Sequence, residues 1–494
     1  MILIKKYINN VIFILIFFSI KNLYSQEIKV QIFDQNNIPL PYTNILNLNN
    51  NLGTISNENG YFNLDSNQHH EDDTIKFLHI GFKTYKITFN ELKNIKNIIL
   101  EENIINLSEI FIFQSEPKPL EIIQKILYNA EKNYKTKPIK QKVFIRNRNK
   151  GKTKKFNIDY KKSSINELGE NFFDKIVKKV PEKWLDYSDI LTEVYEANVG
   201  GDSVELKINP IRVVELNDES LNGIEDLQKI FNEKLNSIDS TEYWKFKSGI
   251  FGVKIPKPEI KNLKDDEIKV KDYSNLVKWK IKKIKLSNKK TWDFLYKPKN
   301  YQFSLIGGTK INNEDVYIID FEALKKGKYN GRIYVSIKNY AIVKADFYMP
   351  EDKINKFNLL GVFMSTNEKI ISIYFEKLDS FYSLKYFTET QSYNFGIKRP
   401  ISLIKKKENG LFDKKIDEIK VNINADFESS NSYEYFVQNI KPIKKSEFKS
   451  LIQKKTFKKI NVDQFNKKLW KGFSIIEPTD YMNNYKKKSG NLKN

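Results

Sequence analysis

Three histidines, His69, His70 and His79, are the side chains whose types and spacing could carry metal or acid–base chemistry. The pair His70-Glu71 matches the start of the zinc-protease signature HExxH, but the fifth position is Thr74 and the surrounding residues read as a polar loop. No histidine follows His79, and the chain has no cysteine. These facts exclude Ser-His, Cys-His and histidine-ligated zinc catalysis from the larger part of the protein.

Acidic side chains offer two weaker alternatives. The loop at 65–73 could hold a divalent ion through Asp65, Glu71, Asp72 and Asp73, although a solvated loop is the simpler interpretation. The run at 265–267 (DDE) reads as a charged loop in preference to a glycosidase pair. His79 lacks an evident catalytic partner and reads as a packed strand histidine. The sequence therefore predicts no catalytic, cofactor-binding or metal-binding residue, and no enzyme.

The stretch "GTISNENGYFNL" at 53–64 contains two glycines, which raises the alternative of a phosphate-binding loop. Such a loop requires a helix after the glycine, whereas the residues that follow Gly60 alternate as a strand. We predict a β-hairpin here, with Gly60 at positive φ. The adjacent Gly307 and Gly308 lie inside a strand pattern and predict a bulge.

The net charge of +23 does not indicate nucleic-acid binding. The basic residues are nearly all lysines and are spread along the chain, whereas base and phosphate recognition favours arginine. The arginines are Arg146, Arg148, Arg212, Arg332 and Arg399. We expect a solvated surface and no nucleic-acid partner.

The N-terminus has the pattern of a secretory signal. Lys5 and Lys6 precede the apolar run at 11–20, and Ser25 offers a small residue before the cleavage point. The run is about half the 20 residues that a spanning helix needs. The absence of cysteine excludes disulfides and a lipid-bearing cysteine. We expect an exported protein, periplasmic or associated with the outer membrane.

The residue patterns predict a mainly β fold, because short alternating strands dominate the chain. About seven short strands before residue 114 indicate a small β-sandwich. An amphipathic helix over 116–135 connects it to a mixed segment, with strands near 143–145 and 156–160 and helices near 170–180 and 223–237. A curved antiparallel sheet of at least six strands follows. The predicted parts are a signal peptide at 1–25, the sandwich at 26–114, a helical connector and mixed α/β segment at 115–275, the sheet at 276–440 and a Lys-rich tail at 441–494.

The first part resembles the carboxypeptidase-like regulatory domain, a transthyretin-like sandwich of exported proteins. Three stretches carry the resemblance: "DQNNIPLPYTNILNLNNNLGTISNENGYFNL" from Asp34, "DTIKFLHIGFKTYKI" from Asp73 and "LEENIINLSEIFI" from Leu100. In that family the sandwich is noncatalytic, so the resemblance implies a contact module. A weaker resemblance to lipoprotein-carrier-like half-barrels rests on "KYNGRIYVSIKNYAIVKADF" at 328–347 and "LWKGFSIIEPTDY" at 469–481.

Together these observations favour a non-enzymatic envelope protein that acts as a binding or scaffold module and docks an envelope protein or a glycan. The alternative is a carrier, in which the inner face of the C-terminal sheet shelters a lipid or acyl chain. A packed core is the simpler interpretation of the same strands. Another alternative is an accessory component of an outer-membrane transport system. Peripheral association with a membrane is compatible with each of these.

Overall fold

The computed structural model describes residues 27–50, 52–103, 117–134, 137–200, 203–216, 233, 239, 241–249, 251–255, 267–312, 314–354, 356–409, 413–471 and 473–486. The predicted signal peptide, the strand expected at 107–113, nearly all of the helix expected at 223–237 and the acids at 265 and 266 lie outside the described residues. The chain divides into two compact units. The first unit contains residues 1–103 and 472–479, and the second contains the remainder.

The first unit is a β-sandwich of two sheets. One sheet has the order β4-β1-β7, with β1 antiparallel to β4 and parallel to β7. The other has the order β3-β2-β5-β6 and is antiparallel. The strands are β1 (Glu27–Phe33), β2 (Asn44–Asn47), β3 (Gly53–Ile55), β4 (Tyr61–Asp65), β5 (Thr74–Leu78), β6 (Tyr85–Thr88) and β7 (Asn97–Ile99), with the short helices η1 (Ser66–Gln68) and α2 (Phe89–Leu92). Alternate residues such as Val30, Ile45, Phe62 and Phe77 fill the core between the sheets. The predicted sandwich is confirmed.

The predicted hairpin at 53–64 is wrong, although its turn is correct. β3 pairs with β2 and β4 pairs with β1, so the two strands belong to different sheets. The Asn57 N–H donates to the Tyr61 carbonyl at 2.8 Å, and Gly60 has the expected positive φ of 76°. A Cβ on Gly60 would lie 2.5 Å from the Ile32 carbonyl oxygen, so only glycine fits this corner. The turn therefore carries the chain from one sheet to the other.

Residues 473–479 complete the first unit. They run beside β3, where Ile476 forms a parallel bridge with Ile55 and the Thr54 hydroxyl donates to the Ile475 carbonyl at 3.0 Å. The buried Asn57 amide donates to the Pro478 carbonyl at 3.0 Å. The side chains of Ile475 and Ile476 are almost completely buried. A segment more than 400 residues away in sequence thus covers the edge strand of the sandwich.

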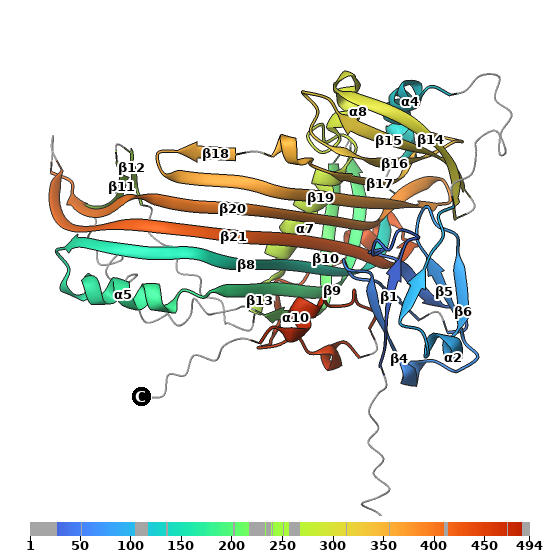
Figure 1. Ribbon diagram of the computed structural model, residues 1–494, viewed down its shortest axis with the longest axis horizontal. Helices are drawn as coiled ribbons and strands as arrows, with labels where there is room; N and C mark the ends of the chain where they lie inside the picture. Colours follow the sequence, from blue (N-terminus) through green and yellow to red (C-terminus); the bar gives the residue numbers. More distant parts are fainter. Residues whose placement is uncertain are drawn as a thin grey trace, which may run out of the picture. The chain divides into compact units, whose positions relative to one another are not determined.

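The second unit is built on a large, almost entirely antiparallel sheet (Figure 1). Its main order is β14-β15-β16-β17-β19-β20-β21-β8-β9-β10-β23, and only the last pair is parallel. The strands on this path are β8 (Ile139–Ser163), β9 (Lys183–Gly200), β10 (Ser203–Leu216), β14 (Tyr301–Ile311), β15 (Glu314–Ala323), β16 (Asn330–Ser336), β17 (Ile342–Tyr348), β19 (Val362–Leu378), β20 (Phe381–Lys407), β21 (Lys414–Pro442) and β23 (Ile460–Asn461). β11 (Glu242–Ser248) joins β20 and β12 (Phe251–Lys254), β18 (Lys356–Leu359) joins β19, and β13 (Glu267–Lys269) pairs with β22 (Thr456–Lys458). The predicted antiparallel sheet is confirmed, and it also includes strands from 139–216.

Five strands of this sheet are unusually long. β19, β20, β21 and β8 contain 17, 27, 29 and 25 residues and lie side by side in that order (Figure 1), and the next strand, β9, contains 18 residues. Typical strands have about five or six residues. The sequence alternation predicts shorter pieces of each. The bulge predicted at Gly307 and Gly308 is confirmed by a register shift between Leu305 and Gly307.

Helices pack against the second unit's strands. α4 (Pro119–Asn133) begins at the expected proline and buries Ile122, Ile123 and Ile126, so the predicted connector helix is confirmed. The helix expected at 170–180 is α5 (Glu170–Lys179). The others are α7 (Val270–Ile284), α8 (Asp293–Tyr296), α9 (Lys445–Ser450) and α10 (Asp480–Asn484), with 3-10 turns η2 (Asn166–Leu168), η4 (Pro298–Asn300), η5 (Glu351–Lys353) and η6 (Lys467–Trp470). Among the residues described, no helix has the length and apolar character needed to cross a membrane.

Asn57→Ala tests the connection between the corner and residues 473–479. The side-chain oxygen of Asn57 accepts from the N–H groups of Asn59 and Tyr61, and its amide donates to Pro478. Because the substitution leaves buried polar groups unpaired, we expect a loss of about 3 kcal/mol in the stability of the first unit. Hydrogen exchange at amides of β1 and β5, which do not bond to the Asn57 side chain, measures that unit separately in a two-unit chain.

The matched control is Asn36→Ala, at an exposed loop position of the same unit. We expect it to change stability by less than about 0.5 kcal/mol. Equal exchange rates in the two variants would contradict the role assigned to Asn57.

Candidate functional site

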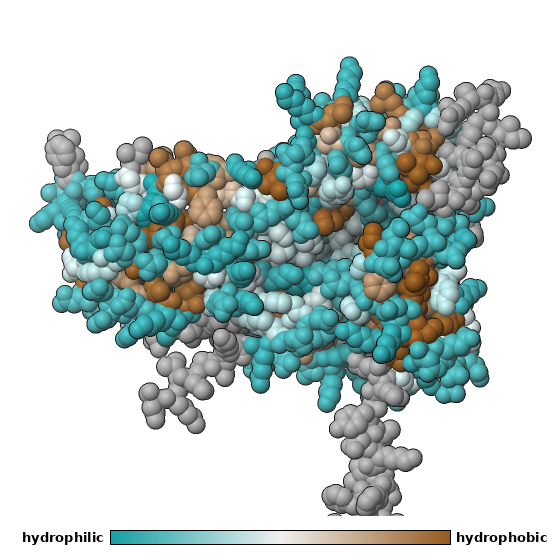
Figure 2. Space-filling model, in the orientation of Figure 1, coloured by the Kyte–Doolittle hydropathy of each residue, from teal (hydrophilic) through white to brown (hydrophobic). Residues whose placement is uncertain are grey.

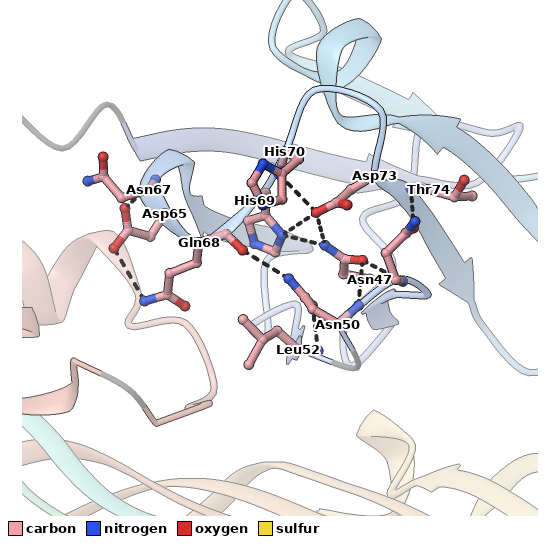
Figure 3. A network of polar contacts seen from close by, with 11 residues as sticks. Asn47, Asn50, Leu52, Asp65, Asn67, Gln68, His69, His70, Asp73 and Thr74 are labelled. Atoms are coloured by element: carbon pink, nitrogen blue, oxygen red, sulfur yellow. Dashed lines mark hydrogen bonds and ion pairs between the residues drawn. The ribbon is translucent and has the colours of Figure 1, made fainter.

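The histidine loop forms a polar network in the first unit (Figure 3). The Asn47 amide donates to His69 Nδ1 at 2.7 Å and to Asp73 Oδ2 at 2.6 Å. The His70 backbone N–H donates to the same Asp73 oxygen at 2.9 Å. The His69 ring also packs on Phe89, with the ring centroids 4.9 Å apart. The network fixes the loop against β2 and β5.

The electrostatics of this network favour a neutral His69. Its side chain is 4% exposed, and burial lowers its pKa. The hydrogen bond from Asn47 lowers the pKa of Asp73, so the carboxylate stays ionised. The His69 imidazole accepts a hydrogen bond at Nδ1 and contacts an aromatic ring. It therefore has a structural role in the packing of the first unit.

The four loop acids do not converge on one point. Asp65 caps η1 by accepting from Asn67 N at 3.0 Å, and Glu71 pairs with Lys93 at 2.8 Å. Asp73 contacts Asn47 directly, whereas Asp65 is joined to Asn47 only through Gln68 and Asn50 (Figure 3). Across the described residues, no group of three or more His, Asp or Glu side chains is placed to hold a metal ion. His79 lies elsewhere, with its Nδ1 3.0 Å from the Thr43 hydroxyl.

A second candidate site lies on one face of the long strands in the second unit. β20 and β21 pair in register from Tyr386 to Lys405, so the odd-numbered residues of both strands share one face. Phe395 is directly opposite Phe427, and the two rings stack with centroids 5.0 Å apart. We call the following set the apolar band: Phe156, Trp184, Met364, Phe395, Ile397 and Phe427.

The apolar band crosses five strands. The Phe427 ring lies 6.0 Å from Phe156 on β8 and 6.3 Å from Trp184 on β9, between ring centroids. Met364 on β19 pairs with Phe395. Gly151 is required for this arrangement, because a Cβ there would lie 2.1 Å from the Trp184 ring. The indole can therefore lie over β8 and reach Phe427.

The apolar band is partly exposed, unlike the core nearby. Phe395 and Met364 are 38% and 46% exposed, and Phe357 on the adjoining β18 is 51% exposed. Asn394 precedes Phe395 on β20 and therefore points to the opposite face of the sheet. On that opposite face lie also Glu428 of β21 and Asn157 of β8. Figure 2 shows hydrophobic side chains gathered among hydrophilic ones over this end of the long strands. One face is thus polar and the other is apolar but incompletely covered.

Two helices cover the same face on either side of the apolar band. α5 packs Phe172 and Phe173 on Ile419 and Val421 of β21. At the other end, Lys280 of α7 reaches Glu389 of β20 at 3.1 Å. Glu389 and the α5-covered Ile401 are about 40 Å apart along the strand, at about 3.3 Å per residue. Among the helices that the structure describes, α5 and α7 cover the two ends of this face, and the apolar band occupies the interval between them.

A small polar pocket of about 330 Å³ lies beyond the start of α5. It is lined by Ser164, Ile165, Asn166, Glu167, Trp244, Lys405 and Asp417. Lys405 is paired with Glu242 at 2.9 Å, and the Ser164 hydroxyl donates to Asp417 at 3.0 Å. These groups hold the end of the sheet to the loop before α5.

None of the residues of the apolar band stands out as a site in the sequence. Each belongs to an alternating strand pattern, which is the usual signature of a packed core. The missing information is register, because only the pairing of five strands brings these side chains to one uncovered interval.

Comparisons with known proteins identify a domain in the first unit. Residues 28–112 match the CarboxypepD_reg-like domain family, which confirms the resemblance of the sandwich. No curated protein matches the chain.

Solved structures show only weak similarity. A LolA superfamily protein from Nitrosomonas europaea and a putative outer membrane lipoprotein-sorting protein domain from Vibrio parahaemolyticus each align with 9% identity and a TM-score of 0.17, over 67% of this chain and 95% of theirs. The MucA/MucB complex from Pseudomonas aeruginosa aligns with 6% identity and a TM-score of 0.16, over 66% of this chain and 99% of that chain. Scores this low establish no shared fold.

The buried His69 makes the stability of the first unit depend on pH. Its folded pKa lies below the unfolded value, so the unfolded chain binds the proton more tightly. We expect stability to fall as the pH drops below about 6.5. Hydrogen exchange in β2 and β5 at pH 7.5 and 5.5 measures this loss, and His69→Gln should reduce it.

His70→Gln is the control, because the His70 residue is exposed on the same loop. It should retain the wild-type dependence on pH. An unchanged dependence in His69→Gln would refute the assignment to His69.

Proposed function

We propose that the protein is a non-enzymatic, exported envelope protein that binds a lipid or acyl chain on the apolar band. The observation that best supports this proposal is the partly exposed apolar band between α5 and α7. A sheet face that is packed at both ends and uncovered between them has room for an elongated apolar ligand. The residue pattern at 1–25 supports export, and the lack of cysteine and of any histidine after His79 supports a role in binding.

The energetics of the apolar band favour a long chain as the ligand. Removing apolar surface from water stabilises a complex by about 0.8 kcal/mol per buried CH₂ group. Phe395 and Met364 remain substantially exposed, and so do Phe357 and Leu359 of β18, at 51% and 52%. A packed core, the simpler interpretation of these strands, does not account for this exposure. An acyl chain lying across the strands would cover these side chains together.

Phe395→Asp tests the binding site. A charge on the apolar band must be desolvated when an acyl chain binds, so we expect at least a tenfold loss of affinity. The measurement is fluorescence titration with 11-(dansylamino)undecanoic acid. Organic extraction of the wild-type protein followed by mass spectrometry should also recover a lipid.

Asn394→Asp is the matched control, since it adds the same charge at the next residue, on the opposite face of β20. It should bind the probe like the wild type. Equal loss in both variants, or no binding and no extracted lipid in the wild type, would end the proposal.

We also propose that the first unit docks an envelope protein or a glycan. The specific observation is the asymmetry of its four-stranded sheet. Residues 473–479 cover the β3 edge, whereas in the described part of the chain no strand pairs with the outer edge of β6. Tyr85 on β6 is 36% exposed. Exposed edge strands are common sites for binding an extended segment of a partner.

Tyr85→Glu tests the docking role. The charged side chain should reduce the capture of purified peptidoglycan or of a purified envelope protein at least fivefold, because edge recognition depends on the side chains beside the paired backbone. Glu58→Gln is the comparison variant, because Glu58 lies in the turn at 57–60 and not on β6. If wild type and Tyr85→Glu capture equal amounts, or none, the sandwich edge is not the docking site.

A further inference from the structure

A cluster of lysines lies where α7 covers the end of the long strands. In the described part of the chain, Lys280, Lys283 and Lys369 all lie within 4.0 Å of the Glu389 carboxylate. Lys280 and Lys283 come from α7, and Lys369 comes from β19. Three cations around one anion leave an excess of positive charge. We call these four residues the lysine cluster.

The lysine cluster is only partly open to water. The side chains of Lys280, Lys283 and Lys369 are 14%, 23% and 16% exposed, and that of Glu389 is 4% exposed. Burial is the main cause that lowers the pKa of Lys280, and the like charges of Lys283 and Lys369 add to it. Concentrated positive charge with limited hydration is unfavourable unless an anion joins it.

A buried hydroxyl group lies beside the same cluster. Tyr433 is directly opposite Glu389 on β21, and Lys280 lies over its ring, 4.5 Å from the centroid. Tyr433 is 2% exposed, and its hydroxyl group has no hydrogen-bond partner among the described residues. Unpaired buried hydroxyl groups are costly and uncommon. The cluster therefore combines surplus cations with an unused polar group.

The lysine cluster and the apolar band share one face. Glu389 and Phe395 are both odd-numbered residues of β20, so their side chains point to the same side. They are six residues apart, or about 20 Å along the strand. Gln391 and Tyr393 lie between them on this face. Charge at one end and apolar surface at the other match a molecule that has a charged head and an apolar tail.

We propose that the lysine cluster binds the anionic, phosphate-bearing head of an amphiphile whose acyl chain lies on the apolar band. This inference rests on the proposed function and adds the class of ligand. Lys280 and Lys283 donate to the phosphate oxygens, and Glu389 keeps the three ammonium groups together when the site is empty. Trp279, 56% exposed beside Lys280 and Lys283, marks the accessible side of the cluster.

The test compares two ligands that share a chain and a glycerol unit. 1-Palmitoyl-lysophosphatidylglycerol carries the phosphate, and 1-monopalmitoylglycerol does not. We expect the full-length protein to bind the anionic ligand at least tenfold more tightly, measured by displacement of the dansyl probe. Lys280→Gln/Lys283→Gln should remove this preference and leave the affinity for 1-monopalmitoylglycerol unchanged.

Lys278→Gln/Lys282→Gln is the matched control. It removes the same charge from α7 at two exposed positions and should keep the preference. Loss of the preference in both double variants would assign it to the general charge of the helix and overturn the proposal.

The remaining outcomes separate the two proposals. Equal binding of both ligands by the wild type would overturn the headgroup site and leave the acyl-chain site intact. Binding of neither ligand would overturn both. Inorganic phosphate is the third arm. If it alone binds at the lysine cluster as tightly as the amphiphile, the site takes a free anion and the headgroup assignment is wrong.

Discussion

The second unit depends on the continuous register between β20 and β21. The two strands pair from Tyr386 to Lys407, with a single shift near the end at Lys405. A one-residue slip would move every side chain to the other face. Continuous pairing therefore keeps Glu389, Phe395 and Leu403 on one side over most of the length of the sheet. The apolar band and the lysine cluster depend on this register together with the pairing of β19, β8 and β9.

Local features of the fold can be predicted from the sequence, whereas the pairing of strands that are distant in the chain cannot. Pro119 and the apolar spacing after it define α4, and Gly60 defines its turn, because both depend on neighbouring residues. The pairing of β3 depends on a different constraint. Asn57 is buried and bonded to Pro478, so the corner at 57–60 links two sheets and does not close a hairpin. Contacts of such separation leave no periodic signal in the chain.

The candidate sites show the same division. The histidines can be named from the sequence, and the expectation that the protein is not an enzyme rests on residue types alone. The sequence does not reveal the apolar band, since Phe395 and Phe427 look like ordinary core residues until their strands are aligned. Likewise, Lys369 and Lys280 are two among many lysines. Their proximity to Glu389 becomes evident only when α7 and β19 are placed beside β20.

The position of residues 473–479 in the first unit affects the order of events during synthesis. A chain emerges from the ribosome N-terminus first, and domains generally fold as they appear. Here the strands of the sandwich emerge before the strip that covers β3, because Ile475 follows Thr54 by 421 residues. Until then the edge of β3 remains available to other strands. The sandwich is therefore completed only after the strands of the second unit, which lie between β3 and this strip in the chain, have been synthesised.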